Sequence, residues 1–281
     1  MILVTTAGKV GGEAARLLAA RGEPVRTLIR DPAKAPALKR AGIQVAMGDL
    51  DAPETLDKAL QGVSSVVLVS PAVPAQEIAV ISAAARAGAS HVVKITSKAA
   101  ADSPIARRRG QAAIESVLTA SGLGWTLLRN NAYMQNFLMM APAIAKTGSF
   151  GTAAGDGRIG HVDARDVAAV AAEIAATPAP HAGQTYWPTG PEALSCAEVA
   201  GVLSKVLGRE VTFRHITLEQ QKQAMISAGL PEPVADDNAR ALTLFADGDA
   251  DYVTTDVPGV LRRPARSFEQ FATDYATAFT A

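Results

Sequence analysis

Short apolar runs alternate with amphipathic stretches along the first 130 residues. The apolar runs are rich in Val, Ile and Leu and end at Gly, Pro or polar residues, a composition typical of buried strands. Between the runs, apolar residues recur at helical spacing, as at Ala14, Leu17 and Leu18. The pattern predicts strands at residues 2–5, 24–29, 43–46, 65–69, 91–96 and 125–128, and helices at 13–21, 32–40, 51–60, 75–87 and 105–120.

This alternation determines the expected fold class. Parallel neighbouring strands need a crossover connection, usually a helix, whereas antiparallel strands can be joined by a tight hairpin. Every predicted strand is separated from the next by a helix, and crossovers of this kind are right-handed. We therefore predict an α/β protein with a Rossmann-type, doubly wound parallel sheet and helices on both of its faces.

The alternation weakens after residue 130. Glycines gather in residues 146–160, which we predict to form a loop, and a helix rich in Ala and Val follows at 163–176. Residues 230–256 contain Pro231, Pro233 and several Asp residues, and we predict surface loops or a mobile lid there. The other predicted elements are strands at 183–187 and 211–213 and helices at 196–207 and 218–228.

Two domains of unequal size follow from this organisation. We predict a Rossmann domain at residues 1–150 and a smaller C-terminal α/β domain at 151–281, which would bind substrate or form a lid. The helix near 163–176 is expected to pack back on the first domain, so the boundary is not sharp.

Composition narrows the class of protein. Of the 281 residues, 48% are hydrophobic and 19% charged, which is enough apolar material for a folded core. The 27 Lys and Arg balance the 27 Asp and Glu, so no long-range field of one sign would hold nucleic acid or an acidic membrane. Cys196 is the single cysteine, and the four His show no zinc-site spacing. We expect a cytoplasmic protein without nucleic-acid, membrane or metal partners.

A glycine-rich turn follows the first predicted strand. In a dinucleotide-binding unit, glycines at this place let the backbone approach a pyrophosphate, and N–H groups at the helix N-terminus stabilise its charge. The alternative is an ordinary tight turn, but the position at the first strand of a βαβ series favours a nucleotide. The candidate phosphate-binding residues are Thr6, Ala7, Gly8, Lys9, Val10 and Gly11.

The end of the second predicted strand indicates which dinucleotide would bind. An acidic residue at this place accepts a hydrogen bond from a free ribose 2′-hydroxyl, whereas an arginine pairs with a 2′-phosphate. This chain has Arg30, with Lys34 one helical turn further on, so two cations would flank a dianion. The alternative is a solvated arginine beside Asp31. If a nucleotide binds, the pattern favours NADP(H).

Polar residues also follow the later strands, at the edge where an open α/β sheet binds its ligand. Asp49 follows the third strand and is a candidate acceptor for an adenine amino group, or else a cap for the helix near Pro53. Ser70 and Pro71 follow the fourth strand. Candidates for the nicotinamide half follow the fifth and sixth strands, at Thr96, Ser97, Lys98, Arg129, Asn130 and Asn131.

Several motifs together resemble the NmrA-like branch of the atypical short-chain dehydrogenases. They include VTTAGKVGGE at the N-terminus, VRTLIRDP and GDL after the second and third strands, SGLGWTLLRNNAYMQN, HVDARDVA, TYWPTGPEALS and EVAGVLSKVLGREV. The likeness covers residues 1–215 and is nearest to bacterial members of the triphenylmethane reductase and NADPH-quinone oxidoreductase type.

The resemblance implies an NADP(H)-binding Rossmann domain, a small substrate domain and specific roles for individual residues. Gly8 and Gly11 would face the pyrophosphate, and Arg30 the 2′-phosphate. Asp49 and Leu50 would contact the adenine. The ribose and nicotinamide side would be contacted by Ser70, Pro71 and Thr96, and the nicotinamide and substrate by Asn131 and Tyr133.

Two departures from the family pattern bear on function. The family turn reads TGATGxxG, whereas TTAGKVG lacks one residue and one glycine. The Tyr-x-x-x-Lys pair of ordinary short-chain dehydrogenases is absent, and Arg107 and Gln111 stand at the tyrosine and lysine positions. A glutamine is neither a cation nor a general acid at neutral pH.

The missing pair constrains the chemistry. Reduction of a ketone to an alcohol develops an alkoxide, and a positioned proton donor contributes roughly 10²- to 10⁴-fold in rate. Quinones, conjugated enones and dyes spread the negative charge and depend less on one acid. Candidate donors are Lys98, Tyr133 and His161. Each also has a purely structural interpretation. Lys98 would be a surface residue, Tyr133 part of an apolar wall or core at 133–145, and His161 a residue at the edge of a strand.

Two classes of function remain open on this sequence. The first is an NADPH-dependent reductase of small, electron-poor conjugated molecules, in which placement of the nicotinamide supplies most of the catalysis. The second is an NADP(H)-sensing regulatory protein with little catalysis, which the shortened turn and the missing pair favour. Either would bind a small molecule as a monomer or homodimer.

Overall fold

The computed structural model describes residues 1–71 and 73–280. Contacts within the chain divide it into two units, and each is built from separate stretches of sequence. The first unit contains Met1–Ser103, Arg107–Asn130 and Ala164–Trp187, and the second contains Pro104–Ala106, Asn131–Asp163 and Pro188–Ala281.

A parallel sheet forms the centre of the first unit. Its seven strands follow the order β3-β2-β1-β4-β5-β6-β8, and every neighbouring pair is parallel. This order places β1 and β4 side by side in the middle, which is the arrangement of a doubly wound Rossmann sheet. The strands are β1 (Ile2–Val4), β2 (Val25–Ile29), β3 (Gln44–Met47), β4 (Ser65–Leu68), β5 (His91–Ser97), β6 (Gly124–Asn130) and β8 (Gln184–Tyr186).

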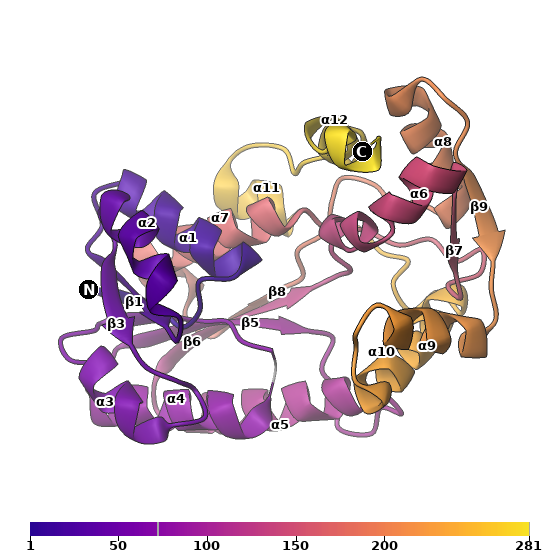
Figure 1. Ribbon diagram of the computed structural model, residues 1–281. Coiled ribbons are helices and arrows are strands. Elements are labelled where there is room, and N and C mark those ends of the chain that lie inside the picture. Colours follow the sequence, from indigo (N-terminus) through magenta and orange to yellow (C-terminus); the bar gives the residue numbers. More distant parts are fainter. Residues whose placement is uncertain (72, 281) are drawn as a thin grey trace. The chain divides into compact units, whose positions relative to one another are not determined.

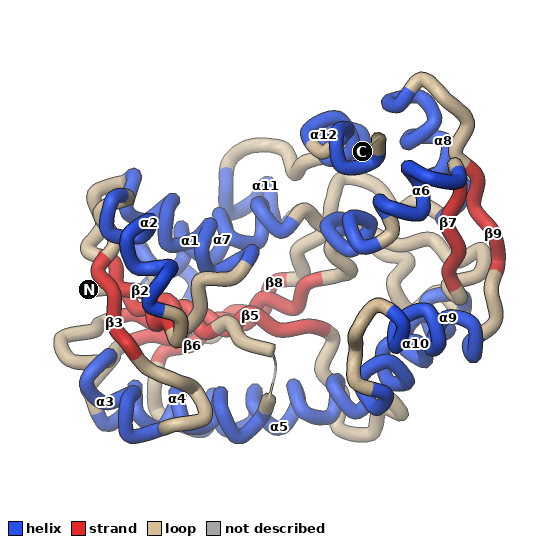
Figure 2. The backbone as a smooth tube through the Cα atoms, viewed as in Figure 1, coloured by secondary structure: helices blue, strands red, loops and turns tan. Residues whose placement is uncertain are grey.

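Helices cover both faces of this sheet. Figures 1 and 2 show α1, α2 and α7 on one face and α3, α4 and α5 on the other. Strands that are covered on both faces read as continuous apolar runs, and β1 and β4 are buried along their whole length. The helices are α1 (Lys9–Ala20), α2 (Ala35–Arg40), α3 (Leu56–Ala59), α4 (Pro74–Arg86), α5 (Ala106–Ala120) and α7 (Ala164–Ala176), with short 3₁₀ turns at Pro32–Lys34, Pro53–Thr55 and Ala179–His181.

The predicted fold class is confirmed, and the six predicted strands of the first 130 residues are all present. The predicted start of the first helix was wrong, because the helix begins earlier in the chain. We placed its start at residue 13, but α1 begins at Lys9 and includes Gly11 and Gly12. Glycine is a poor helix former by propensity. At position 11 close packing overrides that preference, because a Cβ there would lie 2.1 Å from the backbone oxygen of Thr6.

The second unit has its own sheet and core. Strands β7 (Ser149–Thr152) and β9 (Thr212–His215) are parallel, with Phe150 opposite Phe213. Aromatic side chains fill the core, where Phe137 meets Phe150 and Phe268 edge-on at centroid distances of 5.7 and 5.0 Å. The helices are α6 (Ala141–Thr147), α8 (Cys196–Leu207), α9 (Leu218–Ser227), α10 (Glu232–Ala246), α11 (Asp256–Leu261) and α12 (Phe268–Asp274), with 3₁₀ turns at Met134–Met139 and Ala276–Phe279.

Residues 146–160 were predicted to form a loop, and this prediction was wrong for part of the segment, because it contains β7. Gly148 ends α6 in the left-handed conformation, with φ +66°, and the strand follows at once. Its partner β9 lies some 60 residues later in the chain. A local pattern rich in glycine carries no information about so distant a partner, so the strand was missed.

Residues 230–256 were predicted to be surface loops or a lid, and this prediction was wrong for most of the segment, because α10 spans Glu232–Ala246. We interpreted the prolines as loop residues, but Pro233 stands in the first turn, where its missing N–H has no helical partner to lose. Ala235, Ala239 and Ala241 are buried, and α10 packs against α9. Of its acidic residues, Glu232 is exposed, and Asp236 and Asp237 are partly exposed.

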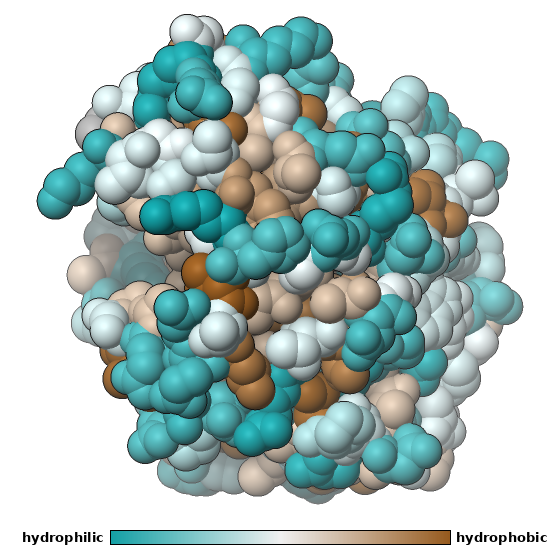
Figure 3. Space-filling view, turned by 90° about the vertical axis from the view of Figure 1, so that its right-hand side faces the viewer, coloured by the Kyte–Doolittle hydropathy of each residue, from teal (hydrophilic) through white to brown (hydrophobic). Residues whose placement is uncertain are grey.

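The division into units does not coincide with the predicted boundary at residue 150. Residues 131–150 belong to the second unit, whereas α7 contacts β4, β5 and β6 of the first. On the face in Figure 3, hydrophobic and hydrophilic residues are mixed. Among the described residues, no helix combines the length and the apolar character that crossing a membrane requires.

Candidate functional site

The carboxyl edge of the first unit's sheet has a topological switch point. The chain leaves β1 toward α1 on one face of the sheet and leaves β4 toward α4 on the other face (Figure 1). In open α/β sheets, ligands bind at this place because the two departing connections diverge. The predicted residues of the first unit lie at or just after the carboxyl ends of β1, β2, β3, β4, β5 and β6 and therefore share this edge.

The glycine turn connects β1 to α1. Gly8 is the N-cap residue of α1 and lies exposed, with φ −80° and ψ −166°, which any residue can adopt. The nearest atom to a Cβ at this position would be Thr6 Oγ1, at 3.9 Å, so the protein itself does not fill the space over Gly8. Gly11 has no such space, because a Cβ at this position would point at the backbone of Thr6.

The N-terminus of α1 has the character of a phosphate site. No side chain caps it, and its first turn contains no acidic residue. The first four N–H groups of a helix have no partner within the helix, and together with the helix dipole they favour an anion. Lys9, exposed in the first turn, adds a positive charge. Thr6 and Ala7 are half-buried in the turn, and Val10 is buried in the core.

Arg30 stands at the end of β2, as predicted for a 2′-phosphate partner. Its side chain is 72% exposed, and its guanidinium lies 3.7 Å from the carboxylate of Asp49. An exposed pair at this distance contributes little to stability, so the guanidinium is available to a stronger anion. Lys34 ends the following 3₁₀ turn and is also exposed.

Asp49 does not cap the turn near Pro53, the alternative that we considered, because the N-cap residue there is Ala52 and no side chain caps it. The Oδ1 of Asp49 accepts a hydrogen bond from the backbone N–H of Asp51 at 3.0 Å, which shapes the loop before the turn at Pro53. Its Oδ2 faces Arg30. Leu50 is buried in the core of the first unit. Contact of Asp49 and Leu50 with an adenine stays a prediction.

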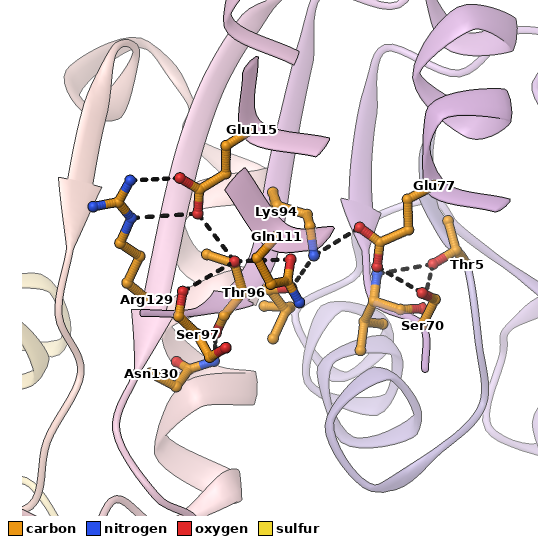
Figure 4. Close-up of polar contacts among 12 residues, drawn as sticks. Thr5, Ser70, Glu77, Lys94, Thr96, Ser97, Gln111, Glu115, Arg129 and Asn130 are labelled. Carbon is orange, nitrogen blue, oxygen red and sulfur yellow. Dashed lines mark hydrogen bonds and ion pairs between the residues drawn. The ribbon is translucent and has the colours of Figure 1, made fainter. Parts of the chain in front are cut away.

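A chain of polar contacts crosses the sheet at this edge (Figure 4). Thr5 Oγ1 donates to the backbone oxygen of Val69 at 2.7 Å and accepts from its N–H at 2.9 Å. Ser70 Oγ donates to Glu77 Oε1 at 2.6 Å. Glu77 Oε2 lies 2.7 Å from the Nζ of Lys94, and both charged side chains are 0% exposed. Pro71, next to Ser70, is exposed.

A second group of contacts surrounds Thr96 on β5 (Figure 4). Thr96 Oγ1 lies 3.0 Å from Gln111 Oε1 and 3.0 Å from Glu115 Oε1, both on α5. Glu115 in turn forms a bidentate pair with Arg129, and Asn130 Nδ2 donates to the backbone oxygen of Thr96 at 3.1 Å. The hydroxyl of Thr96 is therefore engaged with α5, and Gln111, at the position of the missing lysine, helps to hold it.

Asn131 and Tyr133 belong to the second unit, unlike the other predicted cofactor residues. The side chain of Asn131 is buried, donates to the backbone oxygen of Ala250 at 3.0 Å and accepts from the N–H of Ala132 at 2.8 Å. Tyr133 is half-buried at a bridge to Val162. Their approach to nicotinamide or substrate stays a prediction.

The candidate proton donors have different surroundings. His161 is 5% exposed among the rings of Phe137 and Phe268, and burial lowers the pKa of its imidazole to about 4. At neutral pH it is uncharged and inaccessible, so it is a core residue rather than a donor. Lys98 is half-buried directly after β5. A catalytic role for Lys98 or Tyr133 stays a prediction.

The apolar stretch after Tyr133 is largely core. Met134 and Phe137 are buried in the aromatic cluster of the second unit, whereas Met139 is 58% exposed. Within the described part of the chain, no three His, Cys, Asp or Glu side chains gather in a way that could hold a metal ion.

Comparison with known proteins assigns the chain to a family. The model of the NmrA-like family matches residues 1–268. The chain belongs to the NmrA-like family. The match confirms the family that the sequence motifs indicated and extends it well past residue 215.

The relatives of this NmrA-like protein include three characterised reductases. It is 43% identical over 288 residues to the NAD(P)H azoreductase of Xenophilus azovorans, covering 100% of this chain and 99% of the relative. The NADPH-dependent quinone oxidoreductase of Escherichia coli, solved with NADPH, has a TM-score of 0.88 and 30% identity, covering 98% and 100%. Citrobacter triphenylmethane reductase, solved with NADP(H), has a TM-score of 0.86 and 27% identity, covering 98% and 100%.

Sequence reasoning missed the buried pair of Glu77 and Lys94. The signal was present, because Lys94 interrupts the apolar run HVVKITS and Glu77 shares a helical face with Val80 and Ile81. A charge at a position that the hydrophobic period assigns to the core needs a buried partner. We recognised the strand as buried without asking what its lysine would contact.

Substitution of Gly8 should separate cofactor binding from folding. A Cβ at this position would meet no protein atom nearer than Thr6 Oγ1, at 3.9 Å, and a valine would extend into the space over the helix N-terminus. We expect Gly8→Val to raise the Kd for NADPH at least about tenfold while the melting temperature stays near that of the parent protein. Isothermal titration calorimetry and thermal melting measure the two effects.

Two further glycines serve as controls for this prediction. Gly11→Ala would place its Cβ 2.1 Å from the Thr6 oxygen and should lower the stability by roughly 1–3 kcal/mol or more. Gly201→Ala, in α8 with no atom beyond its own stretch of helix within 4 Å of the new Cβ, should leave NADPH binding unchanged. Unaltered NADPH affinity in Gly8→Val would contradict the phosphate assignment.

The burial of His161 predicts a dependence of stability on pH. Its folded pKa of about 4 lies below the unfolded value of 6.5, so the unfolded state binds more protons between these values. The free energy of unfolding should therefore fall as the pH decreases from about 6.5 toward 4, by up to about 3 kcal/mol from this group. Urea unfolding at several pH values measures the slope.

The variant His161→Leu should have a shallower slope than the parent protein. The slope should not vanish, because burial also lowers the pKa of His91 and His181. The exposed His215 provides the matched control, and His215→Gln should retain the parent dependence. An equal slope in His161→Leu and the parent protein would show that His161 is not responsible.

Proposed function

We propose that this NmrA-like protein is an NADPH-dependent reductase of small, planar, electron-poor conjugated molecules, such as azo dyes, quinones and enones. One observation carries the cofactor assignment. The uncapped N-terminus of α1 and the exposed Arg30 lie at the carboxyl edge of the sheet, where the topological switch point is. The prediction of an NAD(P)H-dependent reductase from the sequence agrees with the activities of the azoreductase and quinone oxidoreductase relatives.

The residues at this edge fit a phosphorylated dinucleotide. The space over Gly8 and the free N–H groups of α1 suit a pyrophosphate, and the guanidinium of Arg30 suits a 2′-phosphate. When bound, NADPH supplies the hydride, and the protein contributes position and electrostatics. A 2′-phosphate carries more charge than the carboxylate of Asp49 and would replace it as the partner of Arg30.

The proposed substrates follow from what the α5 side of the site lacks. Arg107 and Gln111 take the places of the tyrosine and lysine, and Gln111 is buried against Thr96. No acid is therefore positioned there to protonate a localised alkoxide. A quinone or an azo group delocalises the charge that arrives with the hydride, and its proton can follow from solvent. Precise placement of the acceptor is then the main catalytic contribution.

Steady-state oxidation of NADPH with a panel of acceptors tests this proposal. We expect saturable turnover with a quinone or an azo dye, and little turnover with simple ketones, because the latter require the missing acid. Tight NADPH binding without turnover of any acceptor would instead support the sensor function. A cytoplasmic location and a monomeric or homodimeric state, expected from the sequence, are part of the proposal.

Substitution of Arg30 tests the cofactor preference directly. We expect Arg30→Ala to raise the KM for NADPH by about 10- to 100-fold, since a charge-assisted pair contributes roughly 1.5–3 kcal/mol. The KM for NADH should stay within about threefold, because NADH lacks the 2′-phosphate. The control is Arg40→Ala at the C-terminal end of α2. An equal loss with both cofactors would remove the assignment.

A further inference from the structure

Two opposite charges lie fully buried inside the first unit. Lys94 comes from the middle of β5 and Glu77 from the first turn of α4, and each side chain is 0% exposed. Burial lowers the pKa of the Lys94 ammonium, and the carboxylates of Glu77 and Glu115 oppose that shift. Hydrophobic residues in place of a buried ion pair are often at least as stable, so stability alone is a weak reason for this pair.

The pair has a structural consequence at its outer end. The two carboxylate oxygens of Glu77 have different partners (Figure 4). Oε2 faces the Lys94 ammonium, and Oε1 accepts a hydrogen bond from the Ser70 hydroxyl at 2.6 Å. The ammonium lies 2.7 Å from Oε2 and holds the carboxylate in one orientation. A hydrogen bond to a carboxylate is shorter and stronger than one between neutral groups. The position of the Ser70 hydroxyl therefore depends on the acceptor oxygen of the buried side chain at position 77.

Ser70 also joins this buried pair to the glycine turn. Its neighbour Val69 forms two backbone hydrogen bonds with the hydroxyl of Thr5, the residue that follows β1. A continuous series of contacts thus links β5, α4, the end of β4 and the end of β1. Both connections that diverge at the switch point are tied into it.

We propose that the Lys94–Glu77 pair is a positioning device for the cofactor, which fixes the Ser70 hydroxyl and the start of the loop after β4 in the conformation that receives the ribose and nicotinamide side. Neither charged side chain is accessible to a ligand, so both act through Ser70. This inference rests on the proposed NADPH-dependent function.

Two double variants of equal charge separate positioning from stability. Glu77→Gln/Lys94→Met removes both charges but leaves an amide oxygen that accepts from Ser70. Glu77→Leu/Lys94→Met removes the same charges and also the oxygen of residue 77 that accepts from Ser70. We expect the Gln/Met variant to bind NADPH within about threefold of the parent protein, and the Leu/Met variant to bind about tenfold more weakly, the scale of one hydrogen bond.

Ser70→Ala completes a double-mutant cycle. On its own it should weaken NADPH binding about tenfold, but in the Leu/Met background it should add little, because the contact is already lost. Equal affinities of the Gln/Met and Leu/Met variants, or a full effect of Ser70→Ala in the Leu/Met background, would overturn the proposal. If a double variant does not fold, unchanged affinity in Ser70→Ala alone overturns it.

Titration of the parent protein with NADPH, followed by intrinsic fluorescence, comes first in this series. Absence of binding there would overturn the proposed function and this inference together. NADPH binding by the parent protein with no difference between the two double variants would overturn only the inference. Melting temperatures of all variants show whether a change in affinity follows from loss of fold.

Discussion

The divergence of the chain after β1 and β4 is the constraint on which the site depends. Both strands are parallel and adjacent, yet their connections leave toward opposite faces of the sheet. This arrangement leaves the N-terminus of α1 facing outward and brings the ends of β2, β4 and β5 to the same edge. Gly8, Arg30 and Ser70, far apart in the sequence, thereby become parts of one candidate nucleotide site.

Two ion pairs at this edge illustrate opposite uses of charge. The pair of Arg30 and Asp49 is exposed and long, so water screens it and a phosphate can replace the carboxylate. The pair of Lys94 and Glu77 is fully buried and short, so neither partner can leave without exposing an uncompensated charge to a low dielectric. The first is suited to binding a ligand, and the second to holding its surroundings in place.

The contacts of α5 explain how this NmrA-like protein relates to ordinary short-chain dehydrogenases. Gln111 and Glu115 satisfy the hydroxyl of Thr96, and Arg129 neutralises Glu115 while its guanidinium lies 5.2 Å from the ring of Trp187. These groups stabilise one another rather than a reacting oxygen. The protein's relatives include an NAD(P)H azoreductase, a triphenylmethane reductase and an NADPH-dependent quinone oxidoreductase.

The sequence by itself determined the order of strands and helices, the family and the residues at the sheet edge, because hydrophobic period, glycine turns and strand ends are local signals. It did not determine β7, whose partner β9 is distant in the chain, or α10, whose prolines suit a first turn as well as a loop. The link from Lys94 through Glu77 to Ser70 was decided only by the tertiary structure. A buried charge is stable only beside its partner, and folding alone brings α4 and β5 together.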